Sequence, residues 1–179
     1  MKTHVPVMLV VAAVLFSCDF RDARDEFDQQ LEYCTVAENN GLLESALEGC
    51  RTALAIAEQH GYAPEVISGL LYRLGRMERQ RGRFTEAKGL MERSLAIEEL
   101  SGESTAVILR MLELSLCNAG EGRWVKGAEL LERASSRFDE LEGSDRKAAA
   151  GALRLFSVRL RGVGQTATAD RFQSRLESL

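Results

Sequence analysis

The sequence predicts an all-α protein, a solenoid of about four antiparallel helical hairpins. A glycine recurs at Gly41, Gly82, Gly122 and Gly164, at spacings of 41, 40 and 42 residues. Small residues stand at fixed distances on both sides of each of these glycines. The chain has only 2 prolines and no stretch that alternates like a strand, so long helices are expected and a sheet is not.

The positions aligned on these glycines form three columns. The small residues five positions after each glycine are Ala46, Ala87, Gly127 and Ala169; those seven positions before are Cys34, Gly75, Ser115 and Ser157; the large residues eight positions before are Tyr33, Leu74, Leu114 and Phe156. Small residues at matched distances from a turn let two antiparallel helices approach closely, and the large residues fill the space beside them. The glycine is therefore the turn of each hairpin.

This pattern resembles the tetratricopeptide repeat (TPR), whose two small positions match the two small columns. Phe84 and Trp124 occupy the family's aromatic position just after the turn. The spacing is longer than the usual repeat of about 34 residues and is similar to the long-helix repeats of kinesin light chains. The resemblance covers residues 22–179 and implies a right-handed superhelix whose concave face binds ligands.

Residues 1–17 read as a bacterial lipoprotein signal peptide. Lys2 is followed by an apolar run over residues 5–16, which is short for a membrane span. The run ends in Leu-Phe-Ser-Cys, which resembles a lipobox and implies cleavage before Cys18 and a lipid on its thiol. An ordinary secretory signal or an uncleaved anchor are the alternatives. Residues 18–21 would be a short tether, and the sequence leaves inner and outer membrane open.

The four hairpins follow in order. The first covers residues 22–60 and turns at Gly41, and the second begins at Pro64, a residue suited to the first turn of a helix. The third begins near residue 104 and turns at residues 120–122. The fourth begins near Ser144, and its last helix, from about Thr166, is polar over much of its surface, as a terminal cap requires.

Three cysteines follow Cys18. Cys34 and Cys50 belong to the two helices of the first hairpin, where export permits a disulfide. Antiparallel pairing brings the two cysteines near each other without placing them clearly opposite. The sequence favours buried thiols over a disulfide and leaves both open. Cys117 is expected to stay reduced.

No catalytic or cofactor-binding pattern is present in the sequence. His60 is the only histidine after residue 18, and its place before Gly61 favours a role at a helix end. No metal-ligand spacing, nucleophile motif or phosphate-binding loop occurs, so we expect no enzyme activity, no cofactor and no metal. The formal charge of −4 argues against a general nucleic-acid binder.

The TPR resemblance implies a partner-binding groove lined by the first helix of each hairpin. The corresponding positions are Asp28, Leu31, Thr35 and Glu38 in the first hairpin; Tyr72, Arg76 and Arg79 in the second; Leu109, Leu112 and Leu116 in the third; and Arg154, Val158 and Arg161 in the fourth. The lysine and asparagine pattern of the family's carboxylate clamp is absent, so that activity is not expected.

Two features of this face point to a partner. Leu109, Leu112 and Leu116 form an apolar stripe beyond what the hairpin core needs, and a partner or a neighbouring hairpin must cover it. Arginines flank this stripe, and they would bind carboxylates of a partner or pair with local glutamates. A partner segment with apolar anchors and acidic residues would fit this face, as a helix or an extended peptide.

The sequence thus predicts a lipid-anchored, non-enzymatic scaffold that binds another protein of the bacterial cell envelope. A homodimer closed by the apolar stripe is one alternative. A regulatory sensor that binds a small ligand in the groove is another. The partner and the biological process are not encoded in any recognisable motif.

Overall fold

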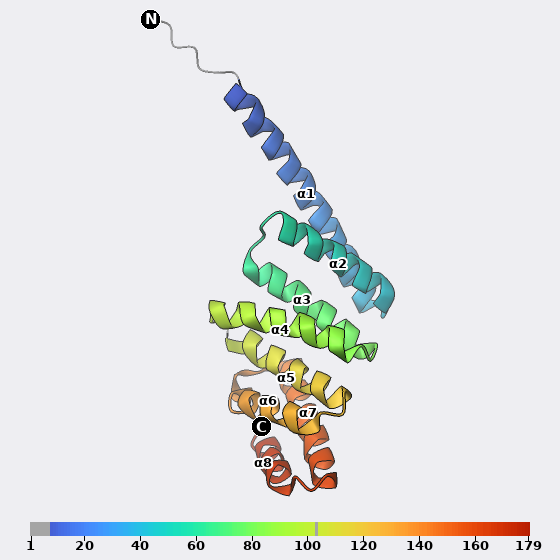
Figure 1. Cartoon of the computed structure of the whole chain (residues 1–179), viewed down its shortest axis with the longest axis vertical. Helices are drawn as coiled ribbons and strands as arrows, with labels where there is room; N and C mark the ends of the chain where they lie inside the picture. Colours follow the sequence, from blue (N-terminus) through green and yellow to red (C-terminus); the bar gives the residue numbers. More distant parts are fainter. Residues whose placement is uncertain (1–7, 103) are drawn as a thin grey trace, which may run out of the picture. The chain divides into compact units, whose positions relative to one another are not determined.

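The computed structural model describes the backbone of residues 8–102 and 104–179, and the side chains of residues 21–102 and 105–179. Within these residues the chain is helical and contains no strand. Figure 1 shows the elements in order: α1 (Met8–Asn39), α2 (Leu43–Gln59), α3 (Pro64–Gln80), α4 (Phe84–Ser101), α5 (Ser104–Gly120), α6 (Trp124–Ser135), the 3₁₀ helix η1 (Phe138–Glu140), α7 (Gly143–Gly162) and α8 (Thr166–Glu177). The predicted all-α class and the hairpin order are confirmed.

The four aligned glycines are the turns of the hairpins. Their φ angles are +70° at Gly41, +75° at Gly82, +78° at Gly122 and +79° at Gly164, a left-handed conformation that glycine adopts without steric cost. After each glycine the next residue donates its N–H to a carbonyl five residues back, for example Arg83 to Glu78 at 2.9 Å. These bonds satisfy the free carbonyls of the first helix and set the exit direction of the chain.

The small columns mark close helix contacts, as predicted. A Cβ atom added to Gly127 on α6 would lie 2.7 Å from the backbone oxygen of Ser115 on α5. One added to Gly75 on α3 would lie 2.8 Å from the terminal methyl of Met91 on α4. The backbone of α5 therefore lies where a side chain at position 127 of α6 would begin, and only glycine permits so close an approach.

The large column is buried in three of the four hairpins. Leu74, Leu114 and Phe156 are in the core, whereas Tyr33 on α1 is 45% exposed. Phe156 packs against Trp124 of the preceding hairpin, with ring centroids 5.4 Å apart. No helix of the described part precedes α1, so Tyr33 has no such neighbour.

The chain divides into two compact units, Met1–Leu70 and Leu71–Leu179. In the first unit a disulfide joins Cys34 on α1 to Cys50 on α2, with Cα atoms 5.1 Å apart. The sequence favoured thiols here, and that expectation is wrong. The residue that decides is Gly49, where a Cβ atom would lie 2.9 Å from the backbone nitrogen of Cys34. The missing side chain lets α2 approach until the sulfurs can bond.

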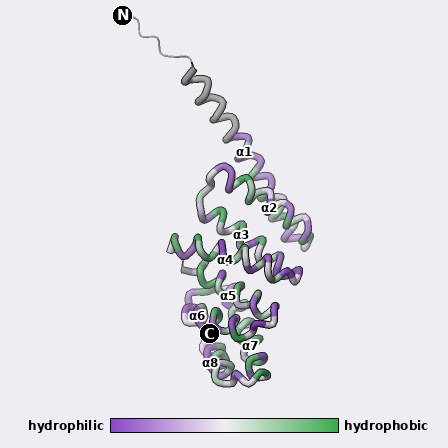
Figure 2. The backbone as a smooth tube through the Cα atoms, viewed as in Figure 1, coloured by the Kyte–Doolittle hydropathy of each residue, from purple (hydrophilic) through white to green (hydrophobic). Residues whose placement is uncertain are grey.

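The second unit has one apolar cluster built from α5, α6, η1, α7 and α8. Phe138, Phe156 and Phe172 are its largest fully buried side chains. Figure 2 shows hydrophobic and hydrophilic residues alternating along these helices, as expected for amphipathic helices packed on a shared core. Cys117 is buried as a free thiol, as the sequence predicted.

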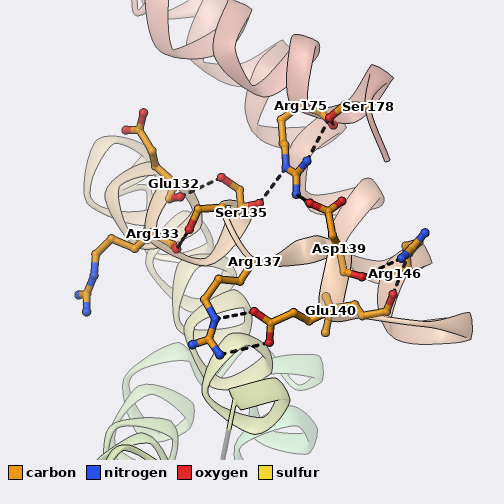
Figure 3. Close-up of polar contacts among 11 residues, drawn as sticks. Glu132, Arg133, Ser135, Arg137, Asp139, Glu140, Arg146, Arg175 and Ser178 are labelled. Carbon is orange, nitrogen blue, oxygen red and sulfur yellow. Dashed lines mark hydrogen bonds and ion pairs between the residues drawn. The ribbon is translucent and has the colours of Figure 1, made fainter.

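Arginines hold the connection between α6 and α7, which is longer than a simple turn. Arg175 of α8 donates to the backbone oxygen of Ser135 at 2.8 Å and to Asp139 Oδ2 at 2.7 Å (Figure 3). Arg146 of α7 donates to the backbone oxygens of Leu141 and Asp139 at 2.7 and 3.0 Å. These bonds give hydrogen-bond donors to backbone carbonyls at the end of α6 and in the connection. Side chains of α7 and α8 therefore order the connection.

Helix α1 begins at Met8, upstream of residue 22, where the sequence predicted the first helix. The side chains of residues 1–20, including the predicted lipidation site Cys18, lie outside the described residues. The signal peptide and the tether remain predictions. Among the helices as described, none has the length and apolar character needed to cross a membrane.

Candidate functional site

The predicted groove arginines of α3 are engaged within the protein. Arg79 Nε lies 2.6 Å from Glu113 Oε2, and Arg76 Nε lies 3.8 Å from Glu113 Oε1. Glu113, on α5, is nearly buried. Charge pairing within the groove thus accounts for part of the arginine pattern, which is the alternative that the sequence left open.

Tyr72, on the same face of α3, belongs to a buried polar network. The guanidinium of Arg110 stacks on its ring at 4.2 Å from the centroid. Arg110 also donates to Glu98 Oε1 and to Ser94 Oγ of α4, both at 3.0 Å. Burial and, to a smaller extent, the Glu113 carboxylate raise the pKa of Tyr72 to about 12. This network joins α3, α4 and α5, and it engages the ring of Tyr72 within the protein.

The structure covers the apolar stripe of α5. Leu112 is 2% exposed and lies in the same cluster as Leu153 and Phe156 of α7. Leu109 and Leu116 are partly buried against that cluster. The prediction that Leu112 faces a partner is therefore wrong, because α7 packs on α5 and takes the place that a partner would have filled.

The groove residues of α7 remain open to solvent. Arg154 and Arg161 are exposed, and Val158 between them is 65% exposed. Arg161 Nη2 donates to Asp170 Oδ1 at 2.6 Å across the last hairpin. Of the predicted groove residues in the second unit, those on α7 keep the most accessible surface.

In the first unit, one of the predicted positions, Asp28, lines a cavity of about 410 Å³ together with Phe27 and Tyr62. Asp28 and Thr35 are exposed, while Leu31 and Glu38 are half-buried. Thr35 uses its hydroxyl to bond the backbone oxygen of Leu31 at 2.8 Å. His60 caps the end of α2 with its backbone N–H bonded to Ile56 at 3.0 Å, as its position predicted.

An exposed apolar surface that the sequence did not predict lies at the start of α6 and the end of α7. We call it the Trp124 surface; it consists of Trp124, Val125, Val158 and Val163 with the basic residues Arg123, Lys126 and Arg159 and the acidic residue Glu129. Val125 and Val163 are 52% and 60% exposed. Two cavities of about 300 and 580 Å³ share Trp124 and Val163. Apolar side chains thus gather where cationic ones border them.

Packing sets the orientation of Trp124. Its ring meets Phe156 edge to face at 68°, and the guanidinium of Arg159 lies 5.6 Å from its centroid. Arg123 pairs with Glu121, whereas Lys126 and Arg159 have no carboxylate partner within the described residues. The sequence placed Trp124 at the aromatic TPR position and assigned it no binding role. The adjacent Val125 and Lys126 were the signal for an exposed surface.

No group of histidine, cysteine or carboxylate side chains in the described part of the chain is arranged to hold a metal ion. Cys117 is the one free thiol there, and burial together with the charge of Glu113 raises its pKa to about 11. A thiol with such a pKa is protonated at neutral pH and is a poor nucleophile.

The arrangement is that of a TPR-like helical repeat fold. No protein-family model matches the sequence, and no curated protein does either. Solved structures do match. A putative kinesin light chain with TPR-like repeats from Podosopora anserina has a TM-score of 0.64 and 19% identity, over 85% of this chain and 74% of that one.

Two further structures share this fold. BtubC (BKLC) from P. vanneervenii has a TM-score of 0.66 and 18% identity, over 92% of this chain and 66% of that one. Rap protein, complexed with Competence and Sporulation Factor, has a TM-score of 0.51 and 20% identity, over 88% of this chain and 52% of that one. These likenesses define the fold and include the kinesin-light-chain variety that the repeat length indicated.

Proposed function

We propose that the chain is a lipid-anchored, non-enzymatic scaffold of the bacterial cell envelope that binds a segment of another protein at the Trp124 surface. The observation that carries this proposal is the exposure of Val125, Val158 and Val163 around the half-buried Trp124, next to Lys126 and Arg159, which pair with no carboxylate of the described residues. A solvent-exposed apolar patch with a charged rim is typical of an interaction site.

The chemistry of the surface defines the partner. An aliphatic or aromatic side chain would fill the cavity beside Trp124, and carboxylates would meet Lys126 and Arg159. Val158 and Arg154 extend the same contact along α7, so the predicted groove and the Trp124 surface meet at Val158. The Rap structure offers a precedent, since a chain of similar fold is complexed there with another molecule.

Two features support the membrane anchor. The lipobox-like segment ends at Cys18, and the Cys34–Cys50 disulfide suits an oxidising compartment outside the cytoplasm. Labelling with a radioactive fatty acid tests the anchor: the wild-type chain should incorporate label, and Cys18→Ser should not. Equal labelling of both chains would contradict lipidation at Cys18.

The partner site is tested by placing a photocrosslinker at Val158 and irradiating intact cells. We expect a crosslink to a different envelope protein, which Val125→Asp weakens by about tenfold because it puts a carboxylate into the apolar contact. A crosslinker at Leu100, which is also exposed but lies on α4, is the control. Crosslinks from Val158 only to the same chain would favour the homodimer, and equal crosslinks from both positions would contradict the site.

A further inference from the structure

Another cavity is lined by residues of α4, α5 and α6. It has a volume of about 340 Å³. Its apolar lining consists of Leu95, Leu114 and Leu130, and Asn118 is the polar residue beside them. The charged residues of its rim are Lys88, Lys126, Arg133, Glu92 and Glu129. We call it the Asn118 crevice. None of these residues belongs to the predicted groove.

Asn118 has a buried oxygen that nothing in the protein satisfies. The side chain is 1% exposed, and its Nδ2 donates to the backbone oxygen of Leu114 at 2.8 Å. That bond fixes the amide orientation, so Oδ1 is the atom left over, and it has no donor within reach. A buried acceptor without a partner costs about 1–3 kcal/mol, and most such atoms in folded proteins are satisfied. Because Asn118 lines the crevice, a segment bound there is a source of the missing N–H or O–H donor.

The charged side chains of the rim are also unpaired within the described residues. None of the side chains of Lys88, Lys126, Arg133, Glu92 and Glu129 makes a hydrogen bond or ion pair with another described residue. In Figure 3 the guanidinium of Arg133 extends away from the polar contacts of the α6–α7 connection. Three cations against two carboxylates give the rim a surplus positive charge, which favours an anionic group in the ligand.

We propose that the Asn118 crevice binds an extended polypeptide segment in which an aliphatic residue neighbours an acidic one. The main-chain N–H of the aliphatic residue donates to Asn118 Oδ1, and its side chain covers the partly exposed Leu95 and Leu130. The acidic side chain lies against the surplus cations of the rim. An ordered water could satisfy Oδ1 alone, but it would leave the leucines and the rim charges uncovered.

The proposal is independent of the Trp124 surface, although the two sites adjoin around α6. Lys126 and Glu129 line both the crevice and the larger cavity beside Trp124. One partner segment could thus contact both, but the crevice is tested alone with a peptide too short to reach Trp124 and with variants that change only one site.

The probe is the capped tripeptide acetyl-Asp-Leu-Asp amide, titrated into the full chain in detergent and followed by NMR of the leucine methyl groups. We expect shifts for Leu95, Leu114 and Leu130. Methylating the leucine nitrogen of the probe removes only the donor and should weaken binding about tenfold. Equal affinity for both peptides, or shifts confined to other leucines, would overturn the proposal. Water would then be the partner of Asn118 Oδ1.

Asn118→Leu is the matched protein variant, because it replaces the unsatisfied amide by an apolar side chain of similar size. We expect it to keep the fold and to bind the two peptides equally. Val158→Asp changes the Trp124 surface and should leave the affinity for the tripeptide unchanged. If Val158→Asp weakened the tripeptide as much as Asn118→Leu does, the assignment to the crevice would be wrong. The comparison of the two peptides on the wild-type chain stands even if Asn118→Leu does not fold.

Discussion

At the scale of single residues, Gly127 and Gly75 occupy matched small columns but differ in what surrounds them. A side chain at Gly127 would meet the backbone oxygen of Ser115, which α5 holds in place, and the ring of Phe156. At Gly75 the nearest atoms belong to the flexible side chain of Met91. The same substitution therefore has different consequences in two equivalent hairpins.

We predict that Gly127→Ala lowers the free energy of unfolding by about 1–3 kcal/mol, because α6 must move away from α5. Gly75→Ala is the matched control and should change it by less than about 1 kcal/mol, since Met91 can rotate and alanine favours a helix. Urea unfolding followed by circular dichroism measures both. A larger loss for Gly75→Ala than for Gly127→Ala would contradict the contacts described here.

The raised pKa of Tyr72 makes the free energy of unfolding depend on pH. Burial and the charge of Glu113 raise its pKa to about 12, above the value of 10 for an exposed tyrosine. Between these values the folded chain holds a proton that the unfolded chain has lost, so stability is retained below pH 10 and falls as the pH rises toward 12. We predict that Tyr72→Phe makes the unfolding free energy fall less steeply above pH 10. Identical slopes for the two chains would show that Tyr72 titrates normally.

At the scale of elements, the disulfide holds the α1–α2 hairpin. It closes a loop with a sequence separation of 16, and the chain-entropy model gives about 3 kcal/mol for a loop of this length. We predict that reduction increases amide hydrogen exchange in α1 and α2 and leaves the exchange of α7 and α8 unchanged. Uniform protection before and after reduction would mean that packing alone holds this hairpin.

The third cysteine provides an internal control for that experiment. Cys117 is buried on α5, and its raised pKa keeps the thiol protonated at neutral pH. Iodoacetamide should therefore modify Cys34 and Cys50 after reduction well before it modifies Cys117 in the folded chain. Rapid modification of Cys117 would show that α5 opens under the same conditions.

At the scale of the whole molecule, the proposed binding function depends on charge as well as apolar area. Arg159 lies over Trp124 at the edge of the exposed valines. We predict that Arg159→Glu slows association with the acidic partner and reduces the salt dependence of its affinity. Surface plasmon resonance with the crosslinked partner, at two salt concentrations, measures this, and an unchanged association rate would remove Arg159 from the site.

The sequence alone determined the helices and their turns. Gly41, Gly82, Gly122 and Gly164 end helices because a left-handed residue is needed at each turn, and the small columns place the close contacts from their distance to that turn. These are local properties, readable from spacing. The TPR-like fold follows from them and is confirmed by the solved structures.

Tertiary packing alone decided which candidate residues are free to bind. Leu112 belongs to the predicted stripe but is buried by α7, Arg79 is paired with Glu113, and the disulfide depends on the close approach that Gly49 allows. The Trp124 surface and the unsatisfied oxygen of Asn118 likewise depend on neighbours distant in sequence. The physical reason is that exposure and pairing are set by which helices lie against each other, and a periodic pattern identifies a face without showing what covers it.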